Sequence, residues 1–369
     1  MSGVQAAAAP VMAPPAPPYP AAAAAVTVPA PKAPTTAPAG SLTSRVLNGH
    51  RFWIWGLAFS PDGRWLASGG TTDHTAILWD AVEGRELRTF PGTLSLPSVD
   101  FSPDGRLLAL AASDDKETVS SISLWDSANP EQLRNLVGHQ GPCFCVRFSP
   151  DGRLLASTEG GMTINLWDVS TGQIIKVFKQ GPLRSKAYGG QFRSALAFSP
   201  DGRYLASRSW PATLWNVASG EQVLTFGPEY LTLFATIFVG FTPDSRSLVE
   251  VRGNGTIRVW DVATGKLASV LADPPNRSNA CTWILCAALS KDGRHLAVAC
   301  NFTADEPKGK DVVLWDVPSA RPLGTVPVSD GSWAVVFSPD GQWLAVTDTL
   351  CGDGKSSGII KFVRVSEIR

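Results

Sequence analysis

A hexapeptide that reads FSPDGR at Phe59–Arg64 returns in near copies along most of the chain. The copies lie 42 to 50 residues apart and begin at Phe59, Phe101, Phe148, Phe198, Phe241, Leu289 and Phe337. Self-similarity at a nearly constant period of this length indicates a repeat architecture, in which each copy belongs to one supersecondary unit. The repeats therefore predict one large repeat domain rather than two unrelated globular domains.

The residue types of this hexapeptide predict a tight turn. The proline presets φ, the aspartate hydrogen-bonds the local backbone, and the glycine accepts a left-handed conformation. The apolar segments 57–59 and 65–67 flank the turn, so we expect each unit to contain two strands joined as a hairpin. In the fifth copy Ser245 replaces the glycine, and we expect it to adopt the left-handed conformation at an energetic cost.

A second signature, Trp-Asp or Trp-Asn, follows six of the turns, with its tryptophan at Trp79, Trp125, Trp167, Trp215, Trp260 and Trp315. In these residues the sequence resembles the WD-repeat β-propeller family, from about residue 42 to the C-terminus. The resemblance implies an all-β fold, a seven-bladed β-propeller whose four-stranded antiparallel blades surround a central channel. In the last unit Val363 and Arg364 replace the Trp-Asp pair.

The two ends of the repeat region predict how such a ring closes. Residues 43–50 read TSRVLNGH and match the end of a later unit, RNLVGH at 134–139, whereas the last unit stops after its third strand at 359–365. We therefore expect the N-terminal strand to pair with the last blade, which would comprise residues 331–365 and roughly 43–47. Circular closure protects strand edges that would otherwise promote aggregation.

The family resemblance implies a hydrogen-bonded tetrad in the first blade, formed by His50, Ser68, Asp73 and Trp79. In the third blade Gly161 occupies the position of the tetrad aspartate. We interpret the tetrad as structural, and the other signature tryptophans as structural too, because a tryptophan in the third strand buries a large surface between blades. These other tryptophans are Trp125, Trp167, Trp215, Trp260 and Trp315.

Residues 1–41 differ in composition from the rest, being mostly alanine and proline. Such a segment buries too little apolar surface to offset its ordering entropy, so we predict a disordered arm followed by a propeller domain over 42–369. A secretory signal would begin with a basic region, whereas the first basic residue is Lys32. We predict no membrane span and a cytoplasmic location, with an atypical export signal as the alternative.

Charge and cysteine content disfavour several other classes. The 32 basic and 32 acidic residues balance, so bulk charge does not indicate binding to nucleic acid or an acidic membrane. Most of the six cysteines lie in apolar runs, which favours reduced, packed thiols in a domain of this size. No cluster of cysteine and histidine residues has the spacing of zinc ligands, so we predict neither a metal site nor a cofactor.

Two sets of residues are candidate partner-binding surfaces. The first is the connection 180–193 with its neighbour in the fourth blade, a basic and aromatic set that contains Arg184, Lys186, Tyr188, Phe192, Arg193, Arg208 and Trp210. Arginine, tyrosine and tryptophan commonly supply interface hot spots. A solvated connection is the alternative interpretation.

The second set consists of aromatic residues that lie four or six positions before the first residue of the hexapeptide in their unit. They are Trp53, Trp55, Phe144, Phe192, Trp283 and Trp333. Residues two apart share a strand face, so these side chains are predicted to line the channel mouth or to pack between blades. The variable connections between second and third strands lie nearby in this fold, and we expect two long ones, at 301–311 and 348–358.

Catalytic motifs find little support, because the sequence contains no Walker, HExxH or Rossmann glycine pattern. The resulting prediction is a non-catalytic scaffold for protein–protein interaction, a monomeric ring that binds protein partners of unknown identity. The alternative is an enzyme or small-ligand binder that uses the central channel, for which His74, Asp114 and Asp115 lie in suitable loops.

Overall fold

The computed structural model describes residues 45–91, 95–113, 120–129, 132–139, 141–159, 163–180, 195–208, 212–226, 236–272, 283–301, 311–329, 331–352 and 355–368. All of them belong to one compact unit, Ser41–Arg369. The predicted arm, residues 1–41, lies outside the described residues. In the described part of the chain no helix has the length and apolar character needed to cross a membrane.

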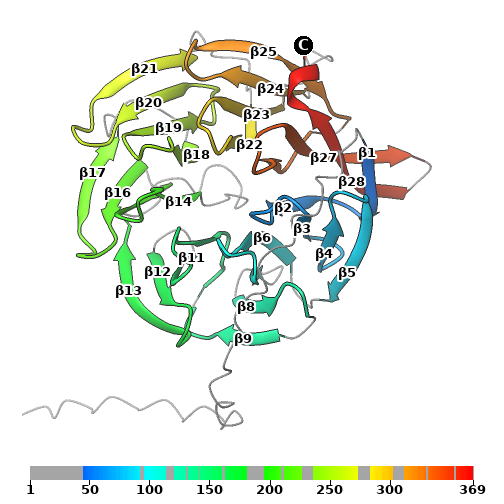
Figure 1. Ribbon diagram of the computed structural model, residues 1–369, viewed down its shortest axis with the longest axis horizontal. Coiled ribbons are helices and arrows are strands. Elements are labelled where there is room, and N and C mark those ends of the chain that lie inside the picture. The colour runs from blue at the N-terminus through cyan, green and yellow to red at the C-terminus, as the bar shows by residue number, and fades with distance from the viewer. Residues whose placement is uncertain are drawn as a thin grey trace, which may run out of the picture. The chain divides into compact units, whose positions relative to one another are not determined.

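The described strands form seven four-stranded antiparallel sheets, arranged as the blades of a ring (Figure 1). Blade one contains β2 (Ile54–Phe59), β3 (Trp65–Gly70), β4 (Thr75–Asp80) and β5 (Arg85–Pro91). Blade two contains β6 (Ser95–Phe101), β7 (Leu107–Ser113), β8 (Ser120–Asp126) and β9 (Gln132–Leu136). Blade three contains β10 (Val146–Phe148), β11 (Leu154–Glu159), β12 (Thr163–Asp168) and β13 (Gln173–Lys179). The first strand of each blade lies nearest the centre and the fourth lies at the rim.

The remaining blades follow the same order around the ring. Blade four contains β14 (Leu196–Phe198), β15 (Tyr204–Ser207), β16 (Ala212–Asn216) and β17 (Gln222–Phe226). Blade five contains β18 (Thr236–Phe241), β19 (Ser247–Arg252), β20 (Ile257–Asp261) and β21 (Leu267–Ala272). Blade six contains β22 (Trp283–Leu289), β23 (His295–Asn301), β24 (Asp311–Asp316) and β25 (Arg321–Pro327). The predicted seven-bladed propeller is confirmed.

Blade seven closes the ring from both ends of the chain. It contains β26 (Val335–Phe337), β27 (Trp343–Gly352), β28 (Lys355–Arg364) and, at the rim, β1 (Arg45–His50). β1 pairs antiparallel with β28, with Leu47 opposite Ile360. In Figure 1 the blue β1 lies beside the red β28. The predicted closure is confirmed, and a short 3-10 helix, η2 (Val365–Glu367), follows β28.

The prediction of a long connection at 348–358 was wrong. β27 continues to Gly352 and β28 begins at Lys355, and the two strands stay paired through Gly352 opposite Lys355. The register between β27 and β28 continues without a break from the buried part of the blade. Each further pair of residues can therefore hydrogen-bond its backbone N–H and C=O groups across the two strands. The other connection predicted to be long, 301–311, lies mainly outside the described residues, and β24 begins at Asp311.

The repeated hexapeptide forms the turn between the first and second strand of each blade. In blade one the N–H of Gly63 donates to the carbonyl of Ser60 at 2.8 Å, and Gly63 has φ 73°. The hydroxyl of Ser60 donates to Asp62 at 2.5 Å and accepts the N–H of Trp65 at 2.8 Å. The serine, whose role was not predicted, therefore connects the turn to the start of the second strand.

Turns of neighbouring blades also contact one another. A Cβ on Gly293 would lie 2.6 Å from Cδ of Pro243 in the preceding blade, so glycine is needed there for close approach as well as for its positive φ. Ser245 has φ 60°, as predicted, and its hydroxyl accepts the N–H of Asp201 from the preceding turn at 3.2 Å. This hydrogen bond partly compensates for the strained conformation.

The hydrophobic core consists of seven clusters, each between two adjacent blades. In the cluster between blades seven and one, Trp79 packs with Leu47 and Phe362. A fully buried tryptophan of this kind typically contributes about 3 to 5 kcal/mol relative to alanine. Between blades six and seven Val363 takes the place of the tryptophan. Every blade therefore depends on both of its neighbours.

Removal of β1 is expected to destabilise the ring. We expect deletion of residues 1–41 to leave the melting temperature almost unchanged. Deletion of residues 1–48 removes most of β1, including the buried Leu47, and leaves the edge of β28 unpaired. The expected cost is about 3 kcal/mol or more, measured by thermal and urea unfolding. Equal melting temperatures for the two truncated proteins would contradict the role of β1.

Candidate functional site

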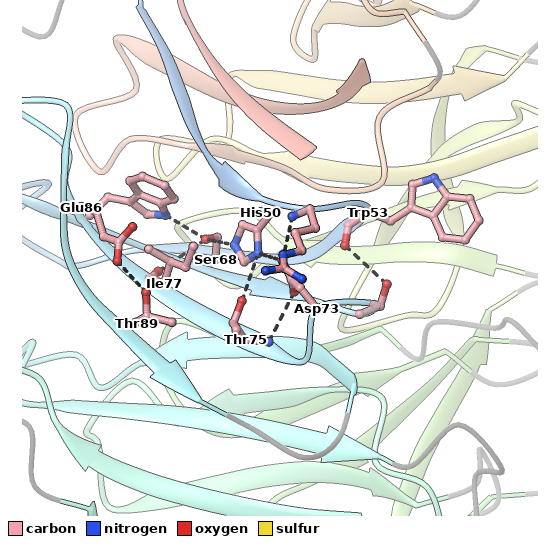
Figure 2. A network of polar contacts seen from close by, with 11 residues as sticks. His50, Trp53, Ser68, Asp73, Thr75, Ile77, Glu86 and Thr89 are labelled. Carbon is pink, nitrogen blue, oxygen red and sulfur yellow. Dashed lines mark hydrogen bonds and ion pairs between the residues drawn. The ribbon is translucent and has the colours of Figure 1, made fainter. Parts of the chain in front are cut away.

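His50, Ser68, Asp73 and Trp79 form one hydrogen-bonded group, which we call the blade-one network. The indole N–H of Trp79 donates to Ser68 at 2.8 Å, and Ser68 Oγ lies 2.7 Å from His50 Nε2. His50 Nδ1 lies 2.9 Å from Asp73 Oδ2. Figure 2 shows His50 between Ser68 and Asp73. The structure thus brings together all four residues of the predicted tetrad.

Burial alone would raise the pKa of Asp73, but its surroundings reverse that effect. The hydrogen bond and charge of His50, together with the N–H groups of Arg51 and Thr75, lower the pKa of Asp73 to about 2. A glycine at position 70 makes room for this contact, since a Cβ there would lie 2.0 Å from Asp73 Oδ1. The carboxylate of blade one therefore comes from the loop between β3 and β4.

Blade three obtains its carboxylate from a different position. Glu159 occupies the position that corresponds to Gly70, and its Oε2 lies 3.5 Å from His139 Nδ1. Asn165 donates to the same oxygen at 2.8 Å. Glu159 in β11 thus supplies the acid that position 161 lacks. The signal that could have revealed it is the acidic residue at a strand position where blade one has glycine.

Blade five replaces the serine of the network by a carboxylate. Glu250 is fully buried and accepts the indole N–H of Trp260 and the Nε–H of Arg252, both at 3.0 Å. Thr236 donates to it at 2.6 Å. A buried ion pair is tolerated only when its hydrogen-bonding groups are satisfied, and Glu250 meets this condition. The roles of Glu250 and Arg252 were not predicted from the sequence.

The other signature tryptophans have their own environments. The indoles of Trp167 and Trp215 donate to Ser157 at 2.7 Å and to Ser207 at 3.0 Å. Trp125 donates to Ser123 at 2.8 Å in its own strand. Trp315 is half-buried in the cluster between blades five and six. All of these tryptophans lie between blades, where they support packing.

The inner strands of all seven blades surround a cavity of about 110 Å³ at the centre of the ring. Most of the side chains that line it are apolar, and they include Trp55, Val99, Phe144, Ile237, Leu285 and Val335. Arg147 in β10 also lines it and is the lining residue that carries a formal charge. The wall of the cavity therefore combines apolar side chains with polar atoms and one guanidinium.

Two charged residues occupy a position that is small or apolar in the other blades. Directly before the first residue of the repeated hexapeptide, blades two and three have Asp100 and Arg147. At the same position the other blades have Ala58, Ala197, Gly240, Ala288 and Val336. Asp100 accepts the N–H of Phe148 in the next blade at 2.7 Å. Burial raises the pKa of Asp100 to about 6, although the charge of Arg147 and this hydrogen bond act in the opposite direction.

Four aromatic side chains meet where the connections β1–β2 and β25–β26 approach the channel. We call Phe52, Trp53, Trp55 and Trp333 the aromatic cluster. Trp333 lies 5.7 Å from Trp53 and is stacked at 5.8 Å on Trp55, and Phe52 meets Trp53 edge-on at 4.4 Å. All four are half-buried. Trp55 also lines the channel, so the cluster joins the cavity to the surface.

The remaining candidates are placed as follows. Phe144 lines the cavity, and Trp283 begins β22, where the structure describes only its backbone. Arg208 is 8% exposed, and burial lowers its pKa to about 10, so its side chain does not form part of an exposed basic patch. Candidates outside the described residues are Arg184, Lys186, Tyr188, Phe192, Arg193, Trp210, Asp114 and Asp115.

A metal site would need several histidine, cysteine, aspartate or glutamate side chains close together. His74 has φ 55° and lies next to the Asp73 of the blade-one network. Among the described residues no group of three or more histidine, cysteine, aspartate or glutamate side chains could hold a metal ion. Among the described residues, Cys143, Cys145, Cys286 and Cys300 form no disulfide.

Comparison with known proteins indicates the family. A model described as "WD domain, G-beta repeat" matches residues 42–80, 84–118 and 130–168. The chain is 30% identical over 294 residues to the nuclear distribution protein PAC1 of Arthroderma otae, covering 71% of this chain and 59% of that protein. It is 27% identical over 226 residues to a guanine nucleotide-binding protein subunit beta of Oryza sativa subsp. japonica, covering 59% of this chain and 58% of the relative. The alignments thus span less than two thirds of these relatives.

The blade-one network is expected to depend on pH through Asp73. Because its pKa of about 2 lies below the unfolded value of 3.8, the stabilisation is present above pH 4 and is lost as the pH falls towards 2. We expect Asp73→Asn to lower the free energy of unfolding by about 2 kcal/mol at pH 6 and by much less at pH 2. Urea unfolding at both pH values measures this, and an equal loss at both would contradict it.

Asp100 should have the opposite effect. Its folded pKa of about 6 exceeds the unfolded value of 3.8, so ionised Asp100 destabilises the fold above pH 6 and neutral Asp100 does not below pH 4. We expect Asp100→Asn to raise the free energy of unfolding by about 2 kcal/mol at pH 7.5 and to change it little at pH 3.5. A loss of stability at pH 7.5 would contradict the expected sign.

Proposed function

The chain belongs to the WD-repeat family, and from this we propose that it is a non-catalytic scaffold that binds protein partners at one face of a rigid propeller. The observation that carries this proposal is the aromatic cluster. Its rings are half-buried and lie together at the channel opening. Tryptophans that are partly covered by one another provide rigid apolar area at low entropic cost, which is typical of interface hot spots.

The position of the cluster supports this role. Phe52, Trp53 and Trp333 lie in the connections that lead from the rim strand of one blade to the inner strand of the next. The strands hold these connections in place, since Thr71 N–H donates to the carbonyl of Trp53 at 3.2 Å and Trp333 N–H donates to Thr347 at 3.0 Å. Side chains on a rigid support lose little entropy on binding.

Three of these residues lie outside the hydrophobic clusters of the core. Among the described residues, the seven core clusters do not include Trp53, Trp55 or Trp333. In Figure 2 the side chain of Trp53 points away from His50 and its hydrogen-bonding partners. A partner could therefore cover this surface without disturbing the structural network.

The basic connection 180–193 is a second proposed contact. It contains Arg184, Lys186 and Arg193 with two aromatic residues between them, and it joins the end of β13 to β14. β14 is the inner strand of blade four, as β2 and β26 are the inner strands of the blades beside the aromatic cluster. The proposed partner would thus contact apolar and cationic groups on one face of the ring.

The relatives support an assembly role. The rice relative is by name a subunit of a guanine nucleotide-binding protein. By analogy we propose that this chain also works in a protein assembly, as a single ring in the cytoplasm. Its partner is defined here only by the chemistry of the proposed surface.

Affinity capture from native extract tests the proposal. The baits are the intact ring, Trp53→Ser with Trp333→Ser, and the triple change Arg184→Ala, Lys186→Ala and Arg193→Ala. We expect the intact ring to retain a specific protein, and at least one variant to retain about tenfold less of it, since hot-spot losses exceed 1.4 kcal/mol. Quantitative mass spectrometry measures the retained protein.

A matched control separates loss of the site from loss of apolar surface in general. Val137 is 82% exposed near the rim strand of blade two, and Val137→Ser should retain the partner in full. All baits must have melting temperatures close to that of the intact ring. Retention of the same protein by all four baits, or of none by the intact ring, would contradict the proposal.

A further inference from the structure

The channel cavity has features that the scaffold function does not need. Residues of all seven blades line it, and most of their side chains are apolar. Blade three nevertheless places Arg147 there, at a position where four of the other blades have alanine or glycine. Removing a charge from water costs free energy of folding. The presence of Arg147 in the wall therefore suggests that its charge has a function.

Local contacts use only part of the Arg147 guanidinium. Its Nη1–H donates to the carbonyl of Val146 at 2.7 Å. A guanidinium has five N–H donors, and no further hydrogen bond of Arg147 is found among the described residues. The side chain is half-buried and lines the cavity. Donors remain available to an anion in the channel.

Asp100 does not neutralise Arg147 by direct pairing. The two charges influence one another electrostatically, but among contacts of the described residues they form no ion pair. One carboxylate oxygen of Asp100 instead accepts the N–H of Phe148 at 2.7 Å. The backbone of β10 therefore holds Asp100 in place, and the Arg147 side chain keeps its positive charge beside the cavity.

The apolar side chains of the wall would contact the uncharged part of a ligand whose anionic end lies at Arg147. Trp55 and Phe144 line the cavity on one side, and Phe238 and Leu285 line it from blades five and six. The volume of about 110 Å³ is somewhat smaller than an apolar cavity that accepts benzene. The space therefore suits about six non-hydrogen atoms, with one charged end.

We propose that the channel binds a short-chain monocarboxylate, with its carboxylate on the Arg147 guanidinium and its alkyl chain against Trp55, Phe144 and Leu285. The carboxylate and the guanidinium match in charge and in planar geometry. The alkyl chain replaces water along an apolar wall. This site shares Trp55 with the aromatic cluster, but its charged contact is Arg147, which is not part of the cluster, so the variants of the two experiments test the two proposals separately.

Titration of the full chain with sodium butyrate, followed by saturation-transfer NMR, tests this proposal. For a ligand of about six non-hydrogen atoms we expect a millimolar Kd. 1-Butanol and butylammonium have chains of the same length without the negative charge, and they should bind at least tenfold more weakly. Absence of butyrate binding up to about 20 mM, or equal binding of 1-butanol, would overturn the proposal.

Three variants locate the site. Arg147→Met removes the charge at similar length and should weaken butyrate binding at least tenfold, whereas Arg147→Lys should retain part of it. Asp100→Asn removes the nearby negative charge and should tighten binding by about threefold. Arg153→Met is the matched control, because it removes the same charge from an exposed turn of the same blade. Unchanged affinity in folded Arg147→Met protein would overturn the assignment.

Discussion

The pairing of β1 with β28 is the contact on which the rest of the ring depends. The strand that completes blade seven leads directly into His50, and His50 belongs to the network of blade one through Ser68. One segment of six residues therefore supplies backbone partners to the last blade and a polar side chain to the first. The sequence repeat is shifted by one strand relative to the structural blade. Closure of the ring is therefore coupled to the hydrogen-bonded network of blade one.

The same displacement explains why no blade is independent. Each rim strand leads to the inner strand of the next blade, and each of the seven hydrophobic clusters contains residues of two blades. Several neighbouring turns also contact one another, where a proline of one turn meets the glycine of the next. Where Ser245 breaks this pattern, a hydrogen bond to Asp201 restores a contact. The result is a rigid frame that holds its connections in fixed positions.

Much of this frame could be predicted from the sequence, because the signals are local and repeated. The turn hexapeptide predicted the hairpin, the Trp-Asp signature predicted the blade, and the unmatched N-terminal strand predicted how the ring closes. The roles of Glu159 and Glu250 could not be read in this way, since their partners lie on other strands or in the preceding connection. The Asp100 and Arg147 pair was missed because its meaning appears only when seven inner strands surround one cavity. The extended hairpin of β27 and β28 depends on register, which composition does not reveal.

Hydrogen–deuterium exchange of the intact chain tests the central claim most directly. If closure by β1 holds the ring together, amides of β1 and β28 should exchange as slowly as those of β3, because all three open only with the whole ring. Exchange of β1 and β28 within seconds, with β3 still protected, would show that the ring is stable without this pairing and would contradict the account.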